Sequence, residues 1–257
     1  MKNIKFTWFA SQRGRQGFYW LGCFFYTLAL SLPVAAGDFG VSPIRIDLDR
    51  STKTGATSVQ NGEADSLRAQ LQLFEWTQDA TGKDQYQKSE DLLYFPKVMS
   101  LNKSEQKLIR VALRLPATTQ EKTYRLFIEE LPAPPPKGSA GTKVTMAVRF
   151  GVPVFVKPVQ ENVQGKIEQI NLSKGVLHFI VHNVGNVHFA IKSLTASSGA
   201  DFSKTINGWY LLAGVAREYT IPIPANDCKK LKAIDITVSI DASELKSTYN
   251  VNQAQCT

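Results

Sequence analysis

Hydrophobic side chains occupy every second position from Val144 to Val156, in the longest alternating run of the chain. The apolar members of this run are Val144, Met146, Val148, Phe150, Val152, Val154 and Val156. Because successive side chains of a strand point to opposite faces, the pattern predicts one strand with a continuous apolar face. About thirteen residues is long for a strand, which usually has five or six. The run is therefore either an ordinary core strand or an edge strand that pairs with a partner chain.

Shorter alternating runs recur in the first half of the chain after Gly37, and no segment there has a helical period. They predict strands at 41–48, 54–60, 67–73, 95–98, 109–115 and 124–129. The polar stretch 79–90 is predicted to be a loop or hairpin tip. The proline-rich stretch 132–141 is predicted to be a long loop, because proline cannot donate a ladder hydrogen bond. This pattern is typical of an all-β fold.

The second half repeats the alternating pattern beyond a linker that we expect near 158–165. Its expected strands are 166–172, 176–181, 187–194, 209–212, 218–223, 234–240 and 247–251. About seven strands in roughly 95 residues is typical of an immunoglobulin-like β-sandwich. We therefore expect a first domain at 37–158, which ends with the long strand, and a second domain at 159–257.

The first 36 residues have the features of a secretory signal peptide. They carry four basic and no acidic side chains, and Phe18–Leu32 is an apolar run that is short for a membrane span. The small residues Val34-Ala35-Ala36 predict cleavage after Ala36. The alternatives are an uncleaved membrane anchor and a lipoprotein modified at Cys23. Cleavage would lower the formal net charge from +8 to +4, because four basic residues leave.

Export would leave two cysteines, Cys228 and Cys256. Two cysteines in an oxidising compartment most simply form one disulfide, which would pin the last predicted strand. Two free thiols are the alternative.

Residues with catalytic or metal-binding potential are few. All three histidines, His178, His182 and His188, lie in the second half. His182 and His188 bracket a predicted turn without a carboxylate or cysteine at ligand spacing, so we expect hydrogen-bonded rather than metal-bound histidines. The sequence has no nucleophile elbow, zinc-protease motif or glycine-rich nucleotide loop, and no basic patch with interleaved aromatic residues for nucleic acid. We expect a binding protein rather than an enzyme, without metal or cofactor.

Basic residues on predicted strands are the candidates for binding chemistry. Arg45 lies between two isoleucines and faces away from them, while Arg149 and Lys157 lie on the less apolar face of the long strand. A buried basic side chain needs a partner, which is either an internal carboxylate or one from outside the chain. Arginine can hold a chain-terminal carboxylate by two parallel hydrogen bonds.

Four motifs in a fixed order carry a resemblance over essentially all of 37–257. They are VSPIRIDL at 41–48, YRLFIEELP at 124–132, VPVFVKP at 152–158 and LLAGVAR at 211–217. Together they make the chain resemble the periplasmic pilus-assembly chaperones of the chaperone–usher pathway. The resemblance implies two immunoglobulin-like β-sandwich domains set at an angle, with a cleft between them.

The resemblance also implies how the long strand would bind a pilin subunit. Such chaperones lend this strand to a subunit that lacks its own last strand, which is donor-strand complementation. The subunit-binding side chains would be Val144, Met146 and Val148. Each buried aliphatic side chain would contribute roughly 1.5–3 kcal/mol of transfer free energy.

The remaining implied site residues are charged. Arg45 matches a first-strand arginine that anchors the C-terminal carboxylate of the subunit. The second anchor of the family is a lysine at the position of Pro153, so Arg149 is a substitute candidate. Because Pro153 has no N–H group, the strand is expected to be an edge, bulged or bent there. Glu121 and Lys157 match members of an interdomain salt bridge.

The expected function is that of a periplasmic chaperone for pilin or fimbrial subunits. It would protect their open groove and deliver them to an outer-membrane usher. A self-capping dimer of the free chaperone is plausible, because an unpaired apolar strand is sticky. The alternative is an exported two-domain surface or structural protein that self-associates through the same edge strand.

Overall fold

The computed structural model of the chain describes residues 39–62, 66–117, 119–131, 147–241 and 243–256. The predicted signal peptide at 1–36, the loop at 132–141, and Val144 and Met146 of the long strand lie outside these residues. Residues 37–257 form one compact unit. Among the described residues, none of the helices has the length and hydrophobicity that a membrane crossing would need.

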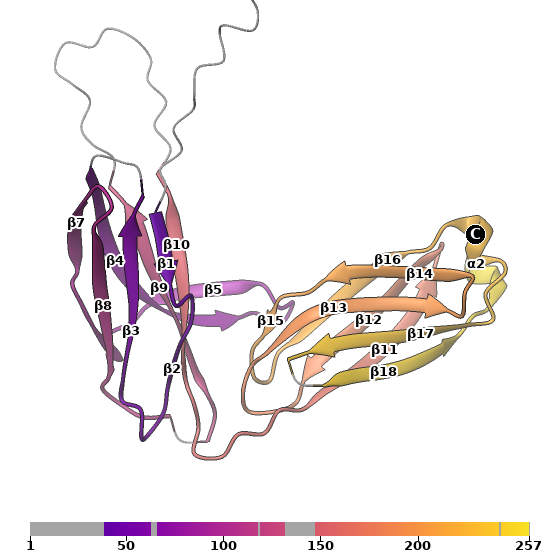
Figure 1. The fold of residues 1–257 in the computed structure, drawn as a ribbon. Helices are drawn as coiled ribbons and strands as arrows, with labels where there is room; N and C mark the ends of the chain where they lie inside the picture. Colours follow the sequence, from indigo (N-terminus) through magenta and orange to yellow (C-terminus); the bar gives the residue numbers. More distant parts are fainter. Residues whose placement is uncertain (1–38, 63–65, 118, 132–146, 242, 257) are drawn as a thin grey trace, which may run out of the picture. The chain divides into compact units, whose positions relative to one another are not determined.

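The first half of this unit is a β-sandwich of two sheets (Figure 1). One sheet has the order β1-β3-β8-β6, and the other has the order β2-β10-β9-β4-β5 with β7 also paired to β4. The strands are β1 (Phe39–Ser42), β2 (Ile46–Leu48), β3 (Thr54–Asn61), β4 (Ser66–Gln78), β5 (Asp84–Lys88), β6 (Leu92–Phe95), β7 (Val98–Asn102), β8 (Gln106–Leu113), β9 (Lys122–Glu130) and β10 (Arg149–Val156). Apolar residues from both sheets fill the core between them, and the even-numbered valines of β10 are among them.

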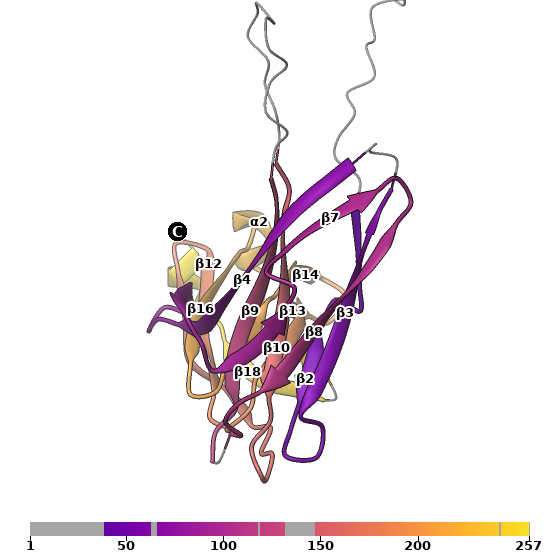
Figure 2. The ribbon, with the colours of Figure 1, turned by 90° about the vertical axis from the view of Figure 1, so that its left-hand side faces the viewer.

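The predicted strand 41–48 is wrong as one continuous element. β1 pairs with β3 in one sheet, whereas β2 pairs with β10 in the other, so the chain changes sheets at residues 43–45. Figure 2 shows the two layers of this sandwich, with β3 and β8 in one of them and β9 and β10 in the other. The change of sheets brings Arg45 next to the end of β10, because Ile46 is in register with Val154.

The predicted polar loop at 79–90 is also wrong in part. β4 continues to Gln78 and β5 covers Asp84–Lys88, so only 79–83 form the turn between them. The side chains here are polar because both strands extend beyond the core, and this polarity predicted a loop. β4 pairs with β9 only as far as Glu75. The two strands form a hairpin that extends beyond the rest of the sheet.

The second half forms another sandwich with its own core, which confirms the all-β, two-sandwich fold. Its sheets have the orders β11-β12-β16 and β14-β13-β17-β18, with β15 also paired to β13. The strands are β11 (Gly165–Ser173), β12 (Val176–Asn183), β13 (Phe189–Ser198), β14 (Phe202–Asn207), β15 (Tyr210–Leu211), β16 (Ala216–Pro222), β17 (Ala233–Ile240) and β18 (Glu244–Asn250). The predicted Cys228–Cys256 disulfide is confirmed, and it joins α2 (Ala225–Cys228) to the short 3-10 helix Gln253–Cys256. The domain boundary at 158 stays a prediction.

Candidate functional site

The functional candidate of this fold is the outer edge of β10. β10 pairs with β9 along its whole length from Arg149 to Val156, but β2 covers its other side only from Val154 onward. Within the described part of the chain, no strand pairs with that outer side from residue 149 to residue 153. An uncovered strand edge of this kind is a template for a strand from another chain.

The hydrogen bonds at the two ends of β10 show which of its backbone groups point outward. Glu130 donates its N–H to the carbonyl of Val148 at 2.9 Å, and Lys157 donates its N–H to the carbonyl of Leu48 at 2.8 Å. Because bonded pairs alternate along an antiparallel ladder, even-numbered residues of β10 bond to β9 and odd-numbered residues point outward. The free N–H groups therefore belong to Arg149 and Gly151, and Pro153 has none.

Pro153 lies on this edge, as the sequence predicted. It stays in register with Arg125 of β9, and the ladder from Arg149 to Val156 shows no bulge. The backbone nitrogen of Pro153, which carries no hydrogen, faces away from β9. The proline therefore removes no hydrogen bond of the β9–β10 ladder. Among the predicted subunit-binding residues, Val148 is half-buried just before β10, and Val144 and Met146 lie outside the described residues.

Arg45 lies beside the covered end of β10. Its guanidinium binds the carboxylate of Asp47, with Nη2 at 2.7 Å from Oδ1, and lies over the ring of Phe155 at 4.7 Å. The two side chains of this ion pair are 36% and 41% exposed. The pair is bidentate, since Nε also donates to Oδ2 at 2.9 Å, so a carboxylate from outside the chain would have to compete with Asp47 for this guanidinium.

A second arginine, which the alternating pattern did not mark as a binding residue, lies on the same face of the sheet. Arg125 of β9 is only 6% exposed, and its guanidinium lies over the ring of Trp76 at 4.0 Å. Its Nη1 donates to the carbonyl of Gly151 at 3.1 Å, whereas its Nε and Nη2 are buried without a hydrogen-bond partner. Burial lowers the pKa of this guanidinium, and the nearby Tyr86 and Asp84 act against that shift. Unpaired N–H groups of a buried cation are costly, so they mark a place where an acceptor is expected.

The two arginines are connected through two neighbouring aromatic rings that are tilted relative to each other. Trp76 and Phe155 have centroids 6.1 Å apart, and Arg125 covers the first of these rings while Arg45 covers the second. Arg149 is not part of this group: it is exposed and lies over Phe127 at 3.8 Å. Since Arg149 precedes Phe155 by six positions on β10, the two backbones are about 20 Å apart at 3.3 Å per residue. The structure therefore brings Arg45 together with Arg125, and not with Arg149.

The two residues predicted to belong to an interdomain salt bridge, Glu121 and Lys157, each bind a different partner. Glu121 accepts hydrogen bonds from the backbone N–H of His188 at 2.8 Å and from its ring Nδ1 at 2.7 Å, and both side chains are buried. Lys157 instead binds Glu161 near the surface at 3.1 Å. His188 also stacks on Phe155, with centroids 3.6 Å apart. Glu121 therefore joins the two sandwiches through a histidine.

The β4–β5 hairpin makes a further connection between the sandwiches. The side-chain amide of Gln78 donates to the carbonyl of Tyr210 and accepts from the N–H of Leu212, each at 2.9 Å. The indole N–H of Trp209 donates to Asp84 at 3.2 Å. These contacts hold Trp209 and Tyr210 beside Arg125, whose guanidinium lies within 5.9 Å of both rings.

The histidines bind carboxylates, as expected for hydrogen-bonded side chains. His178 pairs with Glu218, and His182 pairs with Glu168. In the part of the chain that the structure describes, no three potential metal ligands come together.

The sequence held one signal for Arg125. It alternates with Tyr124 and Leu126, which are core residues, so the period predicted that Arg125 faces away from the core. The pattern could not show that this outer face is covered by Trp76 and the second sandwich, and therefore that Arg125 is buried.

Comparison with known proteins connects this geometry to a family. Residues 38–161 match the pili and flagellar-assembly chaperones, PapD N-terminal domain. The matched range contains the whole first sandwich, including β10 and both arginines of the site. A probable fimbrial chaperone, LpfB of Escherichia coli O157:H7, is 26% identical over 140 residues, which are 52% of this chain and 57% of LpfB. The match thus spans little more than half the length of that relative.

Two solved structures have the same fold. One is a chain of the CsuC–CsuE chaperone–tip adhesion subunit complex of Acinetobacter baumannii, with a TM-score of 0.60 at 18% identity. The match covers 81% of this chain and 98% of the matched chain. The complex of the SafA pilin with the SafB chaperone of Salmonella enterica has a TM-score of 0.56 at 15% identity, covering 84% and 99%. At these identities the likeness establishes a shared fold.

Proposed function

We propose, from the premise that this chain belongs to the pilus-assembly chaperones, that it binds pilin subunits by lending them β10 as a missing strand. The observation that carries the proposal is the outer side of β10 between Arg149 and Pro153, which no strand covers within the described residues. A subunit strand placed there would receive the outward N–H groups of Arg149 and Gly151. Apolar side chains of the subunit would meet the row that continues from Val148 toward Val144 and Met146.

We propose Arg45 and Arg125 as the anchor for the C-terminal carboxylate of the subunit. A chain terminus that runs along β10 toward Pro153 meets a position without a backbone donor, so its last acceptors need side-chain donors. Arg125 lies across from this position, and its Nε and Nη2 have no hydrogen-bond partner. Arg45 is held beside the end of β10 by its partly exposed ion pair with Asp47 and by the ring of Phe155. Hydrogen bonds between guanidinium and carboxylate are short and strong because both groups are charged.

The proposal includes a periplasmic location, cleavage after Ala36 and delivery of subunits to an outer-membrane usher. The chain would act by binding rather than by catalysis, and subunit folding would supply the free energy. In the absence of a subunit, two copies could cap each other along β10, because both would have the same uncovered edge.

Co-purification from the periplasm tests this function. The tagged full chain is expected to emerge with one copy of a small secreted β-rich subunit, identified by intact-mass measurement. The same measurement shows whether the signal peptide has been removed, because cleavage after Ala36 lowers the mass of the chain by a defined amount. A double change of Arg45 and Arg125 to methionine should remove the subunit while the chain itself still accumulates.

The matched control is Arg110→Met, which removes an exposed arginine on the other sheet of the same sandwich. It should retain the subunit. A chain that is always recovered alone or as a homodimer, at any expression level of subunits, would favour a self-associating surface protein and contradict the proposal.

A further inference from the structure

Arg125 is almost fully buried, yet it belongs to none of the ion pairs found among the described residues. Its guanidinium has one acceptor, the carbonyl of Gly151, which is bound by Nη1 at 3.1 Å. A cation that has been removed from water to this extent needs a negative partner or a full set of acceptors. The chain itself therefore compensates the charge of Arg125 only in part.

The two nitrogens of Arg125 without a partner lie on the same edge of its guanidinium. Because the group is planar, the N–H bonds of Nε and Nη2 are nearly parallel and can hold one acceptor group together. Arg45 uses this same edge for the carboxylate of Asp47, with Nε 2.9 Å from Oδ2 and Nη2 2.7 Å from Oδ1. The corresponding edge of Arg125 is a two-pronged donor for which the described residues provide no acceptor.

Trp76 adds a third donor beside this edge. Its side chain is 0% exposed, and its indole Nε1 is buried without a hydrogen-bond partner. The guanidinium carbon of Arg125 lies 4.0 Å from the centroid of the Trp76 ring, so the donors of the two residues are neighbours. Buried polar atoms without a partner are rare in folded proteins. Their concentration at one place indicates an acceptor that comes from outside the chain.

Asp84 is the nearby carboxylate, but its oxygens are engaged elsewhere. Burial lowers the pKa of Arg125, and Tyr86 and Asp84 oppose this shift. Asp84 accepts from the amide of Gln78 at 2.9 Å, from the indole N–H of Trp209 at 3.2 Å and from the hydroxyl of Tyr86 at 3.3 Å. These three bonds hold the carboxylate on the β4–β5 hairpin, where it weakens the effect of burial but does not bind the guanidinium.

We propose that the Nε–Nη2 edge of Arg125 and the indole N–H of Trp76 bind a small inorganic anion, of the kind of chloride, in the chain without a subunit. The anion would satisfy the unpaired donors and neutralise the buried charge. The rings of Trp209 and Tyr210 lie 5.6 and 5.9 Å from the guanidinium and help to exclude water. Charged hydrogen bonds are stronger in such surroundings than in water.

The anion would use the edge of Arg125 that the C-terminal carboxylate of a subunit also needs. This part of the inference rests on the proposed function, whereas the anion site itself does not. The two ligands would exclude each other, so that capture of a subunit releases the anion. The inorganic anion would then be the counter-ion of Arg125 in the free chain, and the subunit would be its counter-ion in the complex.

Thermal unfolding of the full chain, purified without a subunit, tests the anion site. Sodium chloride replaces sodium gluconate at constant ionic strength, so the general screening of charges stays the same. With chloride at about five times its dissociation constant, the melting temperature should rise by about 2–4 °C. The melting temperature of Arg125→Met should not depend on chloride. Crystals of the wild type in sodium bromide should show anomalous density beside Nε and Nη2 of Arg125.

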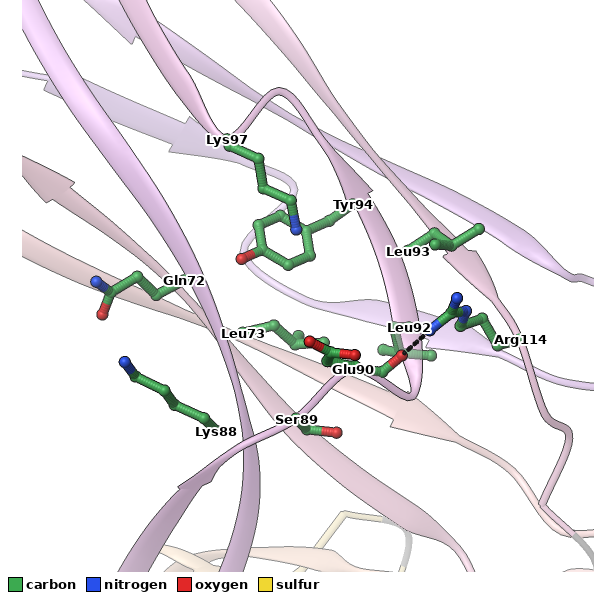
Figure 3. Close-up of a pocket in the computed structure, with 10 residues that line it drawn as sticks. All are labelled: Gln72, Leu73, Lys88, Ser89, Glu90, Leu92, Leu93, Tyr94, Lys97 and Arg114. Atoms are coloured by element: carbon green, nitrogen blue, oxygen red, sulfur yellow. Dashed lines mark hydrogen bonds between the residues drawn. The ribbon is translucent and has the colours of Figure 1, made fainter.

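The matched control is Arg114→Met. Nη1 of Arg114 also donates to a main-chain carbonyl, that of Glu90 at 3.0 Å, but Arg114 is exposed. Figure 3 shows it beside an open hollow of about 500 Å³, where water can reach the guanidinium. This variant should keep the full rise with chloride. An equal rise in Arg125→Met would overturn the inference, and so would wild-type crystals without bromide at Arg125.

Titration of the co-purifying subunit separates this inference from the proposed function. At the same chloride concentration, competition should raise the dissociation constant of the subunit about sixfold for the wild type and not for Arg125→Met. Subunit binding that requires Arg125 in a chain without a halide site would overturn the inference and leave the anchor in place. A halide site that the subunit does not displace would support the anion site and remove Arg125 from the anchor.

Discussion

Arg125 lies directly across from Pro153 in the ladder that joins β9 to β10. One residue lacks a backbone donor on the open edge, and the other brings a guanidinium to that edge by binding the carbonyl of Gly151. The two positions are complementary, because the arginine supplies N–H groups where the proline has none. This relationship makes Arg125 the central residue of the proposed subunit anchor.

Replacing Arg125 with methionine should weaken subunit binding without destabilising the chain. A hydrogen bond to a charged group contributes about 1.5–3 kcal/mol, so the dissociation constant should rise roughly tenfold or more. Methionine keeps an apolar stem over Trp76 and removes a buried cation with unpaired N–H groups, so the melting temperature should stay equal or rise. Titration calorimetry with the co-purifying subunit measures the first effect, and thermal unfolding measures the second.

The lysine variant separates charge from geometry. Arg125→Lys keeps the positive charge but not the paired N–H groups, so its affinity should fall between those of the wild type and Arg125→Met. Unchanged affinity in Arg125→Met would remove this residue from the anchor.

A side chain at Gly151 should impair the same site indirectly. An added Cβ would lie 3.0 Å from Cε1 of Phe127 and 3.8 Å from Cδ of Arg125, so the side chains that cross β10 must move. Gly151→Val should therefore weaken subunit binding, measured by the same calorimetry. Gly40→Val on the edge strand β1 is the control, since nothing lies within 4 Å of a Cβ there. Equal effects of the two changes would speak against a special role of Gly151.

Glu121 should be more important for stability than Lys157. Glu121→Ala would leave the ring and backbone N–H of buried His188 without an acceptor, which costs about 1–3 kcal/mol. Lys157→Ala breaks a pair that is 31% and 45% exposed, and such pairs contribute about 0–1 kcal/mol. Urea denaturation of both variants gives the comparison. The assignment of the interdomain link to Glu121 and His188 would be wrong if Lys157→Ala cost more.

Tryptophan fluorescence should report the contact between the β4–β5 hairpin and β15. After the expected loss of Trp8 and Trp20 with the signal peptide, only Trp76 and Trp209 remain, and both lie beside Arg125. Gln78→Ala removes two hydrogen bonds to Tyr210 and Leu212, so water should gain access to the indoles and shift the emission to longer wavelength. Gln70→Ala on the same strand is the control. Identical spectra for the two variants would show that Gln78 does not hold this contact.

The sequence predicted most of the fold because the evidence for strands is local. The period of two identified β10 and most of the other strands, but it placed a strand at 95–98, where the chain leaves β6 and enters β7, and it missed β14. Two cysteines in a chain that is expected to be exported predicted the observed disulfide. Two further errors in the first sandwich have different causes. The pattern at 41–48 is continuous although the chain changes sheets within it, and the polar strand β5 has no apolar period, because it lies outside the core.

The candidate site was less predictable, because it depends on packing between distant segments. Arg45 and the outward face of Arg125 follow from the period of two. The burial of Arg125 requires Trp76 from β4 and Tyr210 from the second sandwich, which are far from it in sequence. The partner of Glu121 could not be predicted for the same reason, since His188 is 67 residues away in the sequence.

Amide hydrogen exchange along β10, followed by NMR with and without the co-purifying subunit, tests the central claim most directly. Strand addition at the open edge should slow exchange at Arg149 and Gly151, whose N–H groups point outward. The N–H groups of Phe150 and Val152 already bond to β9 and should change little. If amide exchange at Arg149 and Gly151 is not slowed in the complex, this result contradicts the proposal that β10 is lent to the subunit.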